Sequence, residues 1–458
     1  MTVHQDRPPS HGPAPGPGPG HGTGPAADSV PSAAPGLAPG GTPGPASGSV
    51  SGAVSGGVFG SVLGSVLGSV RARSDRAPVL PAPRGPLSRA VAGLLASGPP
   101  AGPFRDDPRE VRRIAGLAEE VRSCDPYGED LQLALHTCYE LHYQGFAGVD
   151  PDWEWDPALL RLRGAMEAVF LAALRRDVRR ADGPEAAGDV AGDVAVDVDG
   201  ALEELLVEPV DARGVSHHLR DEGTWWQMRE YAALRSVYHL KEADPHAWVI
   251  PRLRGRAKAA LVAVENDEFG GGRAEMTHQG LYADLLDDLG LDPSYGAYVE
   301  AAPAVMLATV NMMSLFGLHR SLRAALVGHF AAAEITTAPS ARRMARALER
   351  LGAGPRALLF HTEHIEADAV HEQVLRHEVI GGLLDSEPGL AGEVVLGVRA
   401  TVLLEDRLGD HLLGCWRAGR SALRRPVAGL APGAEEGAMT AAPVDAAGDV
   451  TRAARAAG

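Results

Sequence analysis

Apolar residues recur at helical spacing through most of the chain between about residues 106 and 425. Leu131, Leu135 and Cys138, for example, follow one another at intervals of four and three residues, which places them on one face of a helix. One of these helical segments ends at the glycine run 270–272. We find no convincing strand-like alternation of apolar and polar residues, so the pattern predicts an all-α bundle.

The composition changes at both ends of the chain and once in the middle. The first hundred residues are rich in Gly, Pro, Ala and Ser and poor in large apolar residues, so they cannot bury enough surface to offset chain entropy. A repetitive acidic insert interrupts the helical pattern, and beyond Pro426 the composition reverts to Ala, Gly and Pro. We therefore predict a disordered tail at 1–103, an N-terminal helical region at 104–182, an acidic low-complexity linker at 183–212, the main helical domain at 213–425 and a disordered tail at 426–458.

Residues 47–70 form an uncharged repeat in which glycines recur every four residues from Gly48 to Gly68. That spacing is typical of closely packed membrane helices. Nearly every other residue of the repeat is Gly or Ser, however, and the large apolar side chains are too few for stable insertion. We interpret the repeat as low-complexity sequence and expect no membrane partner.

Charge and cysteine content narrow the class of partner. The net charge of −16 argues against a nucleic-acid partner, which needs a basic stripe, and favours small molecules or proteins. The three cysteines show neither C-x-x-C spacing nor a pairing pattern, so neither a zinc ribbon nor a disulfide scaffold is indicated. The first residues lack the basic start and apolar core of a signal peptide, so a cytoplasmic location is expected.

The stretch 360–377 contains the pattern most typical of a metal site. His364, Asp368 and His371 stand at positions i, i+4 and i+7 of an uninterrupted helical segment. At about 100° per residue, these side chains fall within roughly 60° of one another on one helix face. Two imidazoles and a carboxylate that converge in this way are typical metal ligands. The stretch taken alone also fits a solvated acidic face, since several glutamates lie nearby.

Other helical segments carry polar residues that could complete a metal site. Glu334 interrupts an otherwise apolar face, where a lone carboxylate is costly unless it is paired or metal-bound. Glu242 ends another helical segment, and Glu268 lies ten residues before His278. A dinuclear iron site in a helical bundle needs such carboxylates and imidazoles from different helices.

Glu140 and His142 also suggest ligands at first sight. At positions i and i+2 their side chains diverge by about 200° on a helix, so we interpret both as structural.

Four stretches together resemble the iron-containing redox enzymes of the haem-oxygenase-like diiron oxidase and oxygenase group. They are YHLKEADPHAWVIPRL, ENDEFGGGRAEMTH, GHFAAAEITT and EHIEADAVHEQV, which occur in this order within about residues 224–425. The preceding segment DPYGEDLQLALHTCYELHYQGFAGVDPDWEWDP is similar to the N-terminal helical region of bacterial members. The two long low-complexity insertions belong to this chain and not to the resemblance.

The resemblance implies a haem-oxygenase-like fold of about seven core helices without haem. It also implies two iron ions, Fe(II) or Fe(III), held by Glu242, Glu268, His278, Glu334, His364, Asp368 and His371. This hard donor set also suits manganese. The enzyme class implied is an O2-dependent diiron oxidoreductase that acts on a small organic substrate by N-oxygenation, oxidative decarboxylation or carbon–carbon cleavage.

Several points stay open at this stage. An external electron donor and a homodimer are both compatible with the implied class. A haem-binding or haem-degrading protein of the same fold is an alternative, although it leaves the candidate glutamates without a role. A non-catalytic metal-binding scaffold is another. His361 lies on the same helix face as His364 outside the implied ligand set, as either a neighbour of the ligands or an exposed residue.

Overall fold

A computed structural model describes most of the helical sequence. The described residues are 77–97, 108–181, 196–209, 212–430 and 432, and for 108–111 and 366–369 only the course of the helix is described. The predicted disorder of 1–76, 98–103 and 433–458, the glycine repeat and most of the acidic insert therefore lie outside the described residues.

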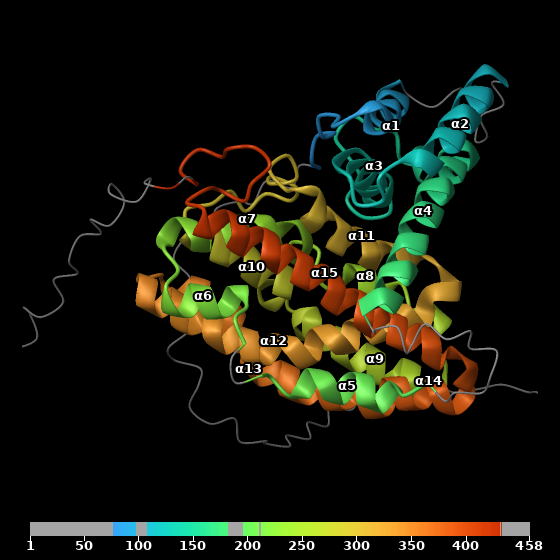
Figure 1. The fold of residues 1–458 in the computed structure, drawn as a ribbon. Helices are drawn as coiled ribbons and strands as arrows, with labels where there is room; N and C mark the ends of the chain where they lie inside the picture. Colours follow the sequence, from blue (N-terminus) through green and yellow to red (C-terminus); the bar gives the residue numbers. More distant parts are fainter. Residues whose placement is uncertain (1–76, 98–107, 182–195, 210–211, 431, 433–458) are drawn as a thin grey trace, which may run out of the picture. The chain divides into compact units, whose positions relative to one another are not determined.

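Every regular element in these described ranges is a helix, as the apolar spacing predicts (Figure 1). In chain order the α-helices are α1 (Pro86–Ala96), α2 (Pro108–Glu120), α3 (Glu129–Glu140), α4 (Pro157–Ala181), α5 (Val198–Leu206), α6 (Val215–Asp221), α7 (Trp225–His239), α8 (Asp244–Ala247), α9 (Gly255–Glu268), α10 (His278–Asp288), α11 (Ala304–Leu318), α12 (Arg323–Leu351), α13 (Pro355–Gln373), α14 (Gly381–Ser386) and α15 (Ala391–Arg417). A π-helix over Val374–Ile380 joins α13 to α14. Within the part of the chain described, no helix is both long and apolar enough to cross a membrane.

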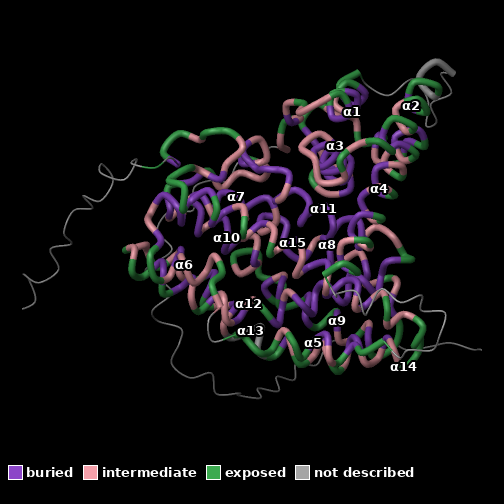
Figure 2. The backbone as a smooth tube through the Cα atoms, in the orientation of Figure 1, coloured by how far each residue is buried: buried purple, intermediate pink, exposed green. Residues whose placement is uncertain are grey.

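Helix α11 lies in the core, and nearly all of its side chains are buried (Figure 2). A helix that is apolar on all sides is typical of such a position. It packs against α3 on one side and against α8, α12 and α15 on others. Its buried Asn311 donates from Nδ2 to the carbonyl oxygen of Gln132 on α3 at 2.8 Å. This contact satisfies polar groups that burial would otherwise leave unpaired.

Two long helices, α12 and α15, approach each other closely through glycines. An added Cβ at Gly328 of α12 would overlap the carbonyl oxygen of Val394, and one at Gly397 of α15 would overlap that of Ala325. Only a residue without a side chain fits at these two positions. The crossing fixes α12, which also packs along α13 and carries one of the candidate ligands.

Residues 77–97 are folded, so the predicted disorder of 1–103 is wrong for this segment. Helix α1 buries Leu87, Val91, Leu94 and Leu95, which recur at helical spacing, and it packs against α3. About ten residues of amphipathic helix are enough to dock a chain segment onto an existing core, even within Pro- and Gly-rich surroundings.

Two other predicted boundaries need similar correction. Residues 198–206 of the predicted linker form α5, whose Val198 and Leu202 are buried and which packs on α12 and α15. The predicted C-terminal tail is ordered at its start, where Leu430 is buried and Arg229 donates from Nη1 to the carbonyl oxygen of Gly429 at 2.6 Å. In both cases a few apolar residues gain enough burial to order a short segment.

Candidate metal centre

The candidate ligands come from five places in the fold that tight turns bring together. Glu242 follows α7 in a turn whose Ala243 has φ of 73°, a left-handed conformation that is uncommon for a residue with a side chain. Glu268 is the last residue of α9, and His278 is the first residue of α10. Glu334 lies in α12, while His364 and His371 lie in α13.

The turn between α9 and α10 explains how Glu268 and His278 meet. Gly270, Gly271 and Gly272 all have positive φ, which permits a tight reversal of the chain. At Gly270 an added Cβ would also overlap the backbone between Met276 and Thr277, so a larger residue does not fit. Thr277 then caps α10, because its Oγ1 accepts a hydrogen bond from the backbone N–H of Gly280 at 3.1 Å.

Six of the seven predicted ligands form two buried groups. Glu242, His278 and His364 make up one group, and Glu268, Glu334 and His371 make up the other. Within each group the three candidate ligand atoms lie within 4.8 Å of one another. We call these groups the first and second triad. The seventh predicted ligand, Asp368, lies in α13, but its side chain falls outside the described residues.

Glu268 belongs to the second triad and also contacts the first. Its Oε2 is 2.7 Å from Nδ1 of His278 in the first triad, and its Oε1 is 3.5 Å from Nδ1 of His371 in the second triad. The two oxygens of one carboxylate therefore face imidazoles of different triads. This arrangement suits a carboxylate that contacts two cations at once.

Hydrogen bonds orient two of the imidazoles. His364 donates its Nδ1–H to the carbonyl oxygen of Phe360 at 2.6 Å, which leaves Nε2 facing Oε1 of Glu242 at 3.7 Å. His371 has Nδ1 at 3.3 Å from Oε2 of Glu334 and Nε2 at 3.3 Å from Oδ2 of Asp267. In each ring one nitrogen contacts a group outside the triads and the other faces a triad carboxylate. Histidines that ligate metals commonly show this division.

The electrostatics of the centre favour a cation. Glu242 and Glu268 are 7% and 5% exposed, and among the described residues their ion pairs are all with histidines. Burial by itself raises the pKa of Glu242, yet the neighbouring His239 and His364 hold its pKa well below its usual range. Buried carboxylates without a lysine or arginine partner are costly, and a divalent cation offsets that cost.

Sequence reasoning missed four residues around the triads. His239 has Nδ1 at 3.0 Å from Oε2 of Glu242, and its ring stacks on Tyr282. Asp267 contacts His371, as described above, from the exposed side of α9. The ring of Tyr238 lies 5.1 Å from that of His239, centroid to centroid, and burial, followed by the charges of the nearby triad glutamates, raises the pKa of Tyr238. Helical spacing from Glu242 could have indicated His239, three positions earlier.

Glu265 is the fourth missed residue and the most unusual. It is 3% exposed, and neither carboxylate oxygen has a hydrogen-bond partner among the described residues. Burial, followed by the charge of Glu268, raises the pKa of Glu265 to about 9. It precedes Glu268 by one helical turn, a spacing that the sequence shows openly.

Three polar residues outside the predicted ligand set also lie outside the triads in the structure. His361 is buried beside His239 and lines a small cavity of about 30 Å³, enough for one water molecule. Glu140 lies in a buried ion pair with Lys241. His142 has Nδ1 at 2.9 Å from Oε1 of Glu154. Neither Glu140 nor His142 belongs to a triad.

Comparison with known proteins agrees with the geometry. Residues 229–406 match the family described as iron-containing redox enzymes. The chain is 25% identical over 252 residues to a nitrosourea synthase of Streptomyces achromogenes subsp. streptozoticus, and the match covers 55% of this chain. The chain spans about half the length of that relative, 52%. The all-α architecture is consistent with the haem-oxygenase-like fold, and residues 229–406 are similar to the iron-containing redox enzymes.

Proposed function

We propose that this protein is a non-haem diiron oxidoreductase that uses O2 to oxidise a small organic substrate. The observation that carries the proposal is the position of Glu268, whose two oxygens face imidazoles of different triads. A single metal ion needs only one such triad, whereas two ions sharing a carboxylate need both. The family match to iron-containing redox enzymes supports iron as the metal.

The donor set fits two iron ions. Three carboxylates and three imidazoles form a hard, oxygen- and nitrogen-rich set that suits iron or manganese. The buried ligand atoms contact one another and few other groups: Oε2 of Glu242 lies 3.0 Å from Nδ1 of His239, and Nδ1 of His278 lies 2.7 Å from Oε2 of Glu268. Carboxylate oxygens and imidazole nitrogens gathered in this way suit a shared metal. When bound, two ferrous ions would supply two electrons for the reduction of O2.

The residues of the chain have distinct tasks in this proposal. Glu242, Glu268 and Glu334 neutralise the charge of the ions, and carboxylates can change their contact mode as that charge changes. Phe360 and Asp267 hold the rings of His364 and His371 in fixed orientations through the second ring nitrogen. The buried surroundings of both triads keep bulk water away from the reacting atoms.

Among the three reaction types expected from the sequence, we favour N-oxygenation. The relative is named for making a nitrosourea, a compound that carries a nitroso group, and therefore an oxidised nitrogen, on a urea nitrogen. Insertion of one oxygen atom of O2 into an N–H bond gives an N–OH group, and the other oxygen atom becomes water with two electrons and two protons. An external electron donor must then restore the ferrous state between turnovers. Ureas and guanidines are the first substrates to test.

Metal analysis of single-residue variants tests the proposal. The full chain, loaded with Fe(II) without oxygen and desalted, should hold about two irons by elemental analysis. Glu242→Ala should lose iron mainly from the first triad, Glu334→Ala and His371→Ala should lose it mainly from the second, and Glu268→Ala should reduce both. Glu393→Ala is the matched control, because that glutamate forms a partly exposed ion pair with Arg175 in another part of the fold.

Two outcomes would contradict the proposal. One is a wild-type protein that retains a single zinc, or no metal, after loading. The other is a Soret absorption band, which would mark a haem protein. For the reaction, the loaded protein with a reductant should consume O2, and mass spectrometry should show one oxygen atom from ¹⁸O2 in the N-oxygenated product. Incorporation into carbon, or loss of CO2, would refute the N-oxygenation part alone.

A further inference from the structure

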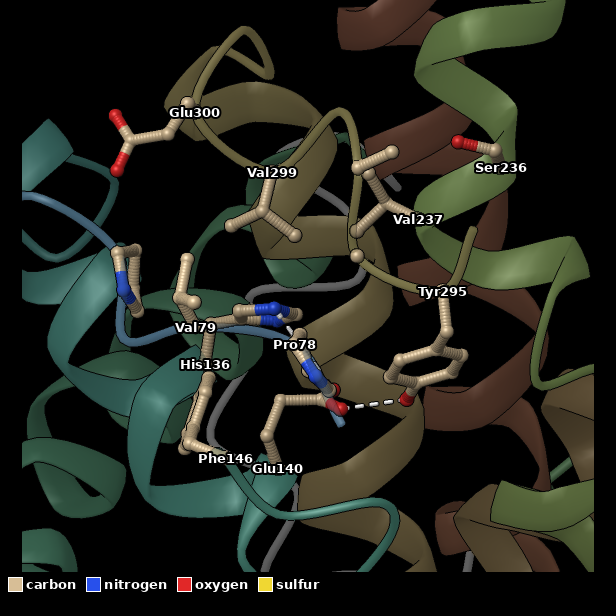
Figure 3. A pocket seen from close by; sticks show the side chains of 13 residues that line it. Pro78, Val79, His136, Glu140, Phe146, Ser236, Val237, Tyr295, Val299 and Glu300 are labelled. Atoms are coloured by element: carbon tan, nitrogen blue, oxygen red, sulfur yellow. Dashed lines mark hydrogen bonds and ion pairs between the residues drawn. The ribbon is translucent and has the colours of Figure 1, made fainter. Parts of the chain in front are cut away.

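A second cavity lies away from the triads and contains none of their residues. Its volume is about 170 Å³, and it is formed by the segment before α1, by α3, by α7 and by the residues before α11 (Figure 3). Most of its wall is apolar, with Val79, Phe146, Val237 and Val299 among the lining residues. Val79 is 77% exposed, so the cavity reaches the surface there.

Most polar groups in the wall already have partners. Glu140 pairs with Lys241 and accepts a hydrogen bond from the hydroxyl of Tyr295 at 2.5 Å (Figure 3). The hydroxyl of Ser236 donates to the carbonyl oxygen of Ala233 at 2.6 Å. Glu300, at the rim, contacts the backbone of Ala82 and the guanidinium of Arg424. The charges of both lining carboxylates are therefore offset within the protein.

His136 is the exception in this wall. It is 3% exposed, and its Nδ1 is buried without a hydrogen-bond partner among the described residues. Its other nitrogen, Nε2, faces Oε1 of Glu140 at 3.8 Å. Burial lowers the pKa of His136 to about 4, so the ring is neutral near pH 7 and carries one N–H. The N–H is favoured on Nε2, which faces a carboxylate, and this leaves a lone pair on Nδ1.

We propose that this cavity binds a small uncharged molecule, largely apolar, that donates one O–H or N–H hydrogen bond to Nδ1 of His136. The size follows from the volume, since an engineered apolar cavity of about 150 Å³ holds benzene. The lack of charge follows from the paired carboxylates, because a buried ion would find no free partner in the wall. The donor follows from the buried lone pair, which is costly to leave unmatched.

Helix α7 lines this cavity and also contacts the first triad, although no residue belongs to both sites. Ser236 and Val237 of α7 line the cavity, whereas His239 contacts Glu242 of the first triad. The binding site is therefore independent of the proposed diiron function, and it can be tested whatever metal the triads hold.

Ligand-observed ¹⁹F NMR on the full-length protein tests the proposal with three matched probes. 4-Fluorophenol has a hydroxyl donor, 4-fluoroanisole has the same oxygen without the donor, and 4-fluorotoluene has no oxygen. The phenol should bind about five- to tenfold more tightly than the other two, as expected for one buried hydrogen bond. Equal binding of all three, or no binding of the phenol at millimolar concentration, would overturn the proposal.

Three variants locate the binding. His136→Phe keeps a flat ring and should abolish the preference for the phenol, whereas Ser236→Ala should preserve it, because that hydroxyl bonds within its own helix. Val299→Phe, at a half-buried lining position, should weaken binding of all three probes by filling the cavity. If the phenol keeps its preference in His136→Phe, or Val299→Phe binds the probes like the wild type, the assignment is wrong. Should His136→Phe fail to fold, the anisole comparison and Val299→Phe decide the question.

Discussion

Replacing Glu140 with Gln removes the negative partner of a buried lysine. Lys241 is 1% exposed and Glu140 is 2% exposed, and the two form an ion pair across 101 residues of chain. The ammonium of Lys241 also lies 4.3 Å from the ring centroid of Tyr143. Gln keeps the shape of the side chain and can still accept the hydrogen bond from Tyr295. The change therefore leaves the positive charge of Lys241 without its main partner.

The expected loss of stability is about 3–5 kcal/mol, the usual cost of an uncompensated buried charge. The double variant Glu140→Gln/Lys241→Met removes both charges and places an apolar chain next to Tyr143. Replacing both members of a buried ion pair is often nearly neutral, so the double variant should recover most of the loss. The coupling energy between the two changes should be at least about 2 kcal/mol.

Urea unfolding followed by circular dichroism measures Glu140→Gln, Lys241→Met and the double variant at pH 7, which together give the coupling energy. Iron content is measured in parallel on the folded protein, where Glu140→Gln should still hold about as much iron as the wild type, since Glu140 belongs to neither triad. The reasoning fails if the urea midpoint is unchanged while iron is lost. It fails equally if the double variant is less stable than Glu140→Gln alone, which would mean that the lysine charge is not the source of the cost.

Three further predictions concern the rest of the fold. Burial lowers the pKa of His329 to about 4, so between pH 6.5 and 4 the unfolded state binds a proton at this residue that the folded state does not. The contribution of His329 to stability should therefore fall by up to about 3 kcal/mol as pH drops through that range, and His329→Gln should make the urea midpoint less dependent on pH. Gly397→Ala should lose about 3 kcal/mol or more in the same unfolding assay, because the methyl group meets the carbonyl oxygen of Ala325, whereas Gly389→Ala, with open space around it, should lose little. A chain starting at residue 77 should keep the unfolding midpoint of the full protein, while one starting at 104 should lose several degrees in thermal unfolding, because it lacks the buried face of α1; equal midpoints for the two would contradict the docking of α1.

Helical spacing was sufficient to predict the fold class, whereas the candidate ligand set needed both helical spacing and the resemblance to a known family. His364 and His371 lie on one face of α13, because helix geometry alone places positions i and i+7 on the same side. Glu334 stood out because a carboxylate is costly on an apolar helix face, whereas Glu242 and Glu268 were assigned as ligands through the resemblance. The spacing and cost arguments use only local sequence, and both selected residues that the structure gathers into the triads.

Two features show what the sequence did not predict. Helix α1 was missed because composition was averaged over a long stretch, and the Lys241–Glu140 contact was missed because its partners are distant in the sequence. Composition averaged over the first hundred residues hid the amphipathic spacing of Leu87, Val91 and Leu94 in α1. Lys241 looks like an ordinary surface lysine until Glu140 is placed beside it by the packing of α3 and the turn after α7. No local pattern predicts such a contact, because its partners are set by tertiary packing.

The adjacency of Lys241 and Glu242 limits how this protein can be divided or recombined. One residue pairs with the N-terminal helices, and the next belongs to the first triad. A segment excised at 229–406, the limits of the family match, carries the lysine away from its carboxylate and uncovers the face of α11 that packs on α3. A segment of this protein that is to be transferred intact by gene fusion should therefore begin no later than α1. It then includes helices that the family match leaves out.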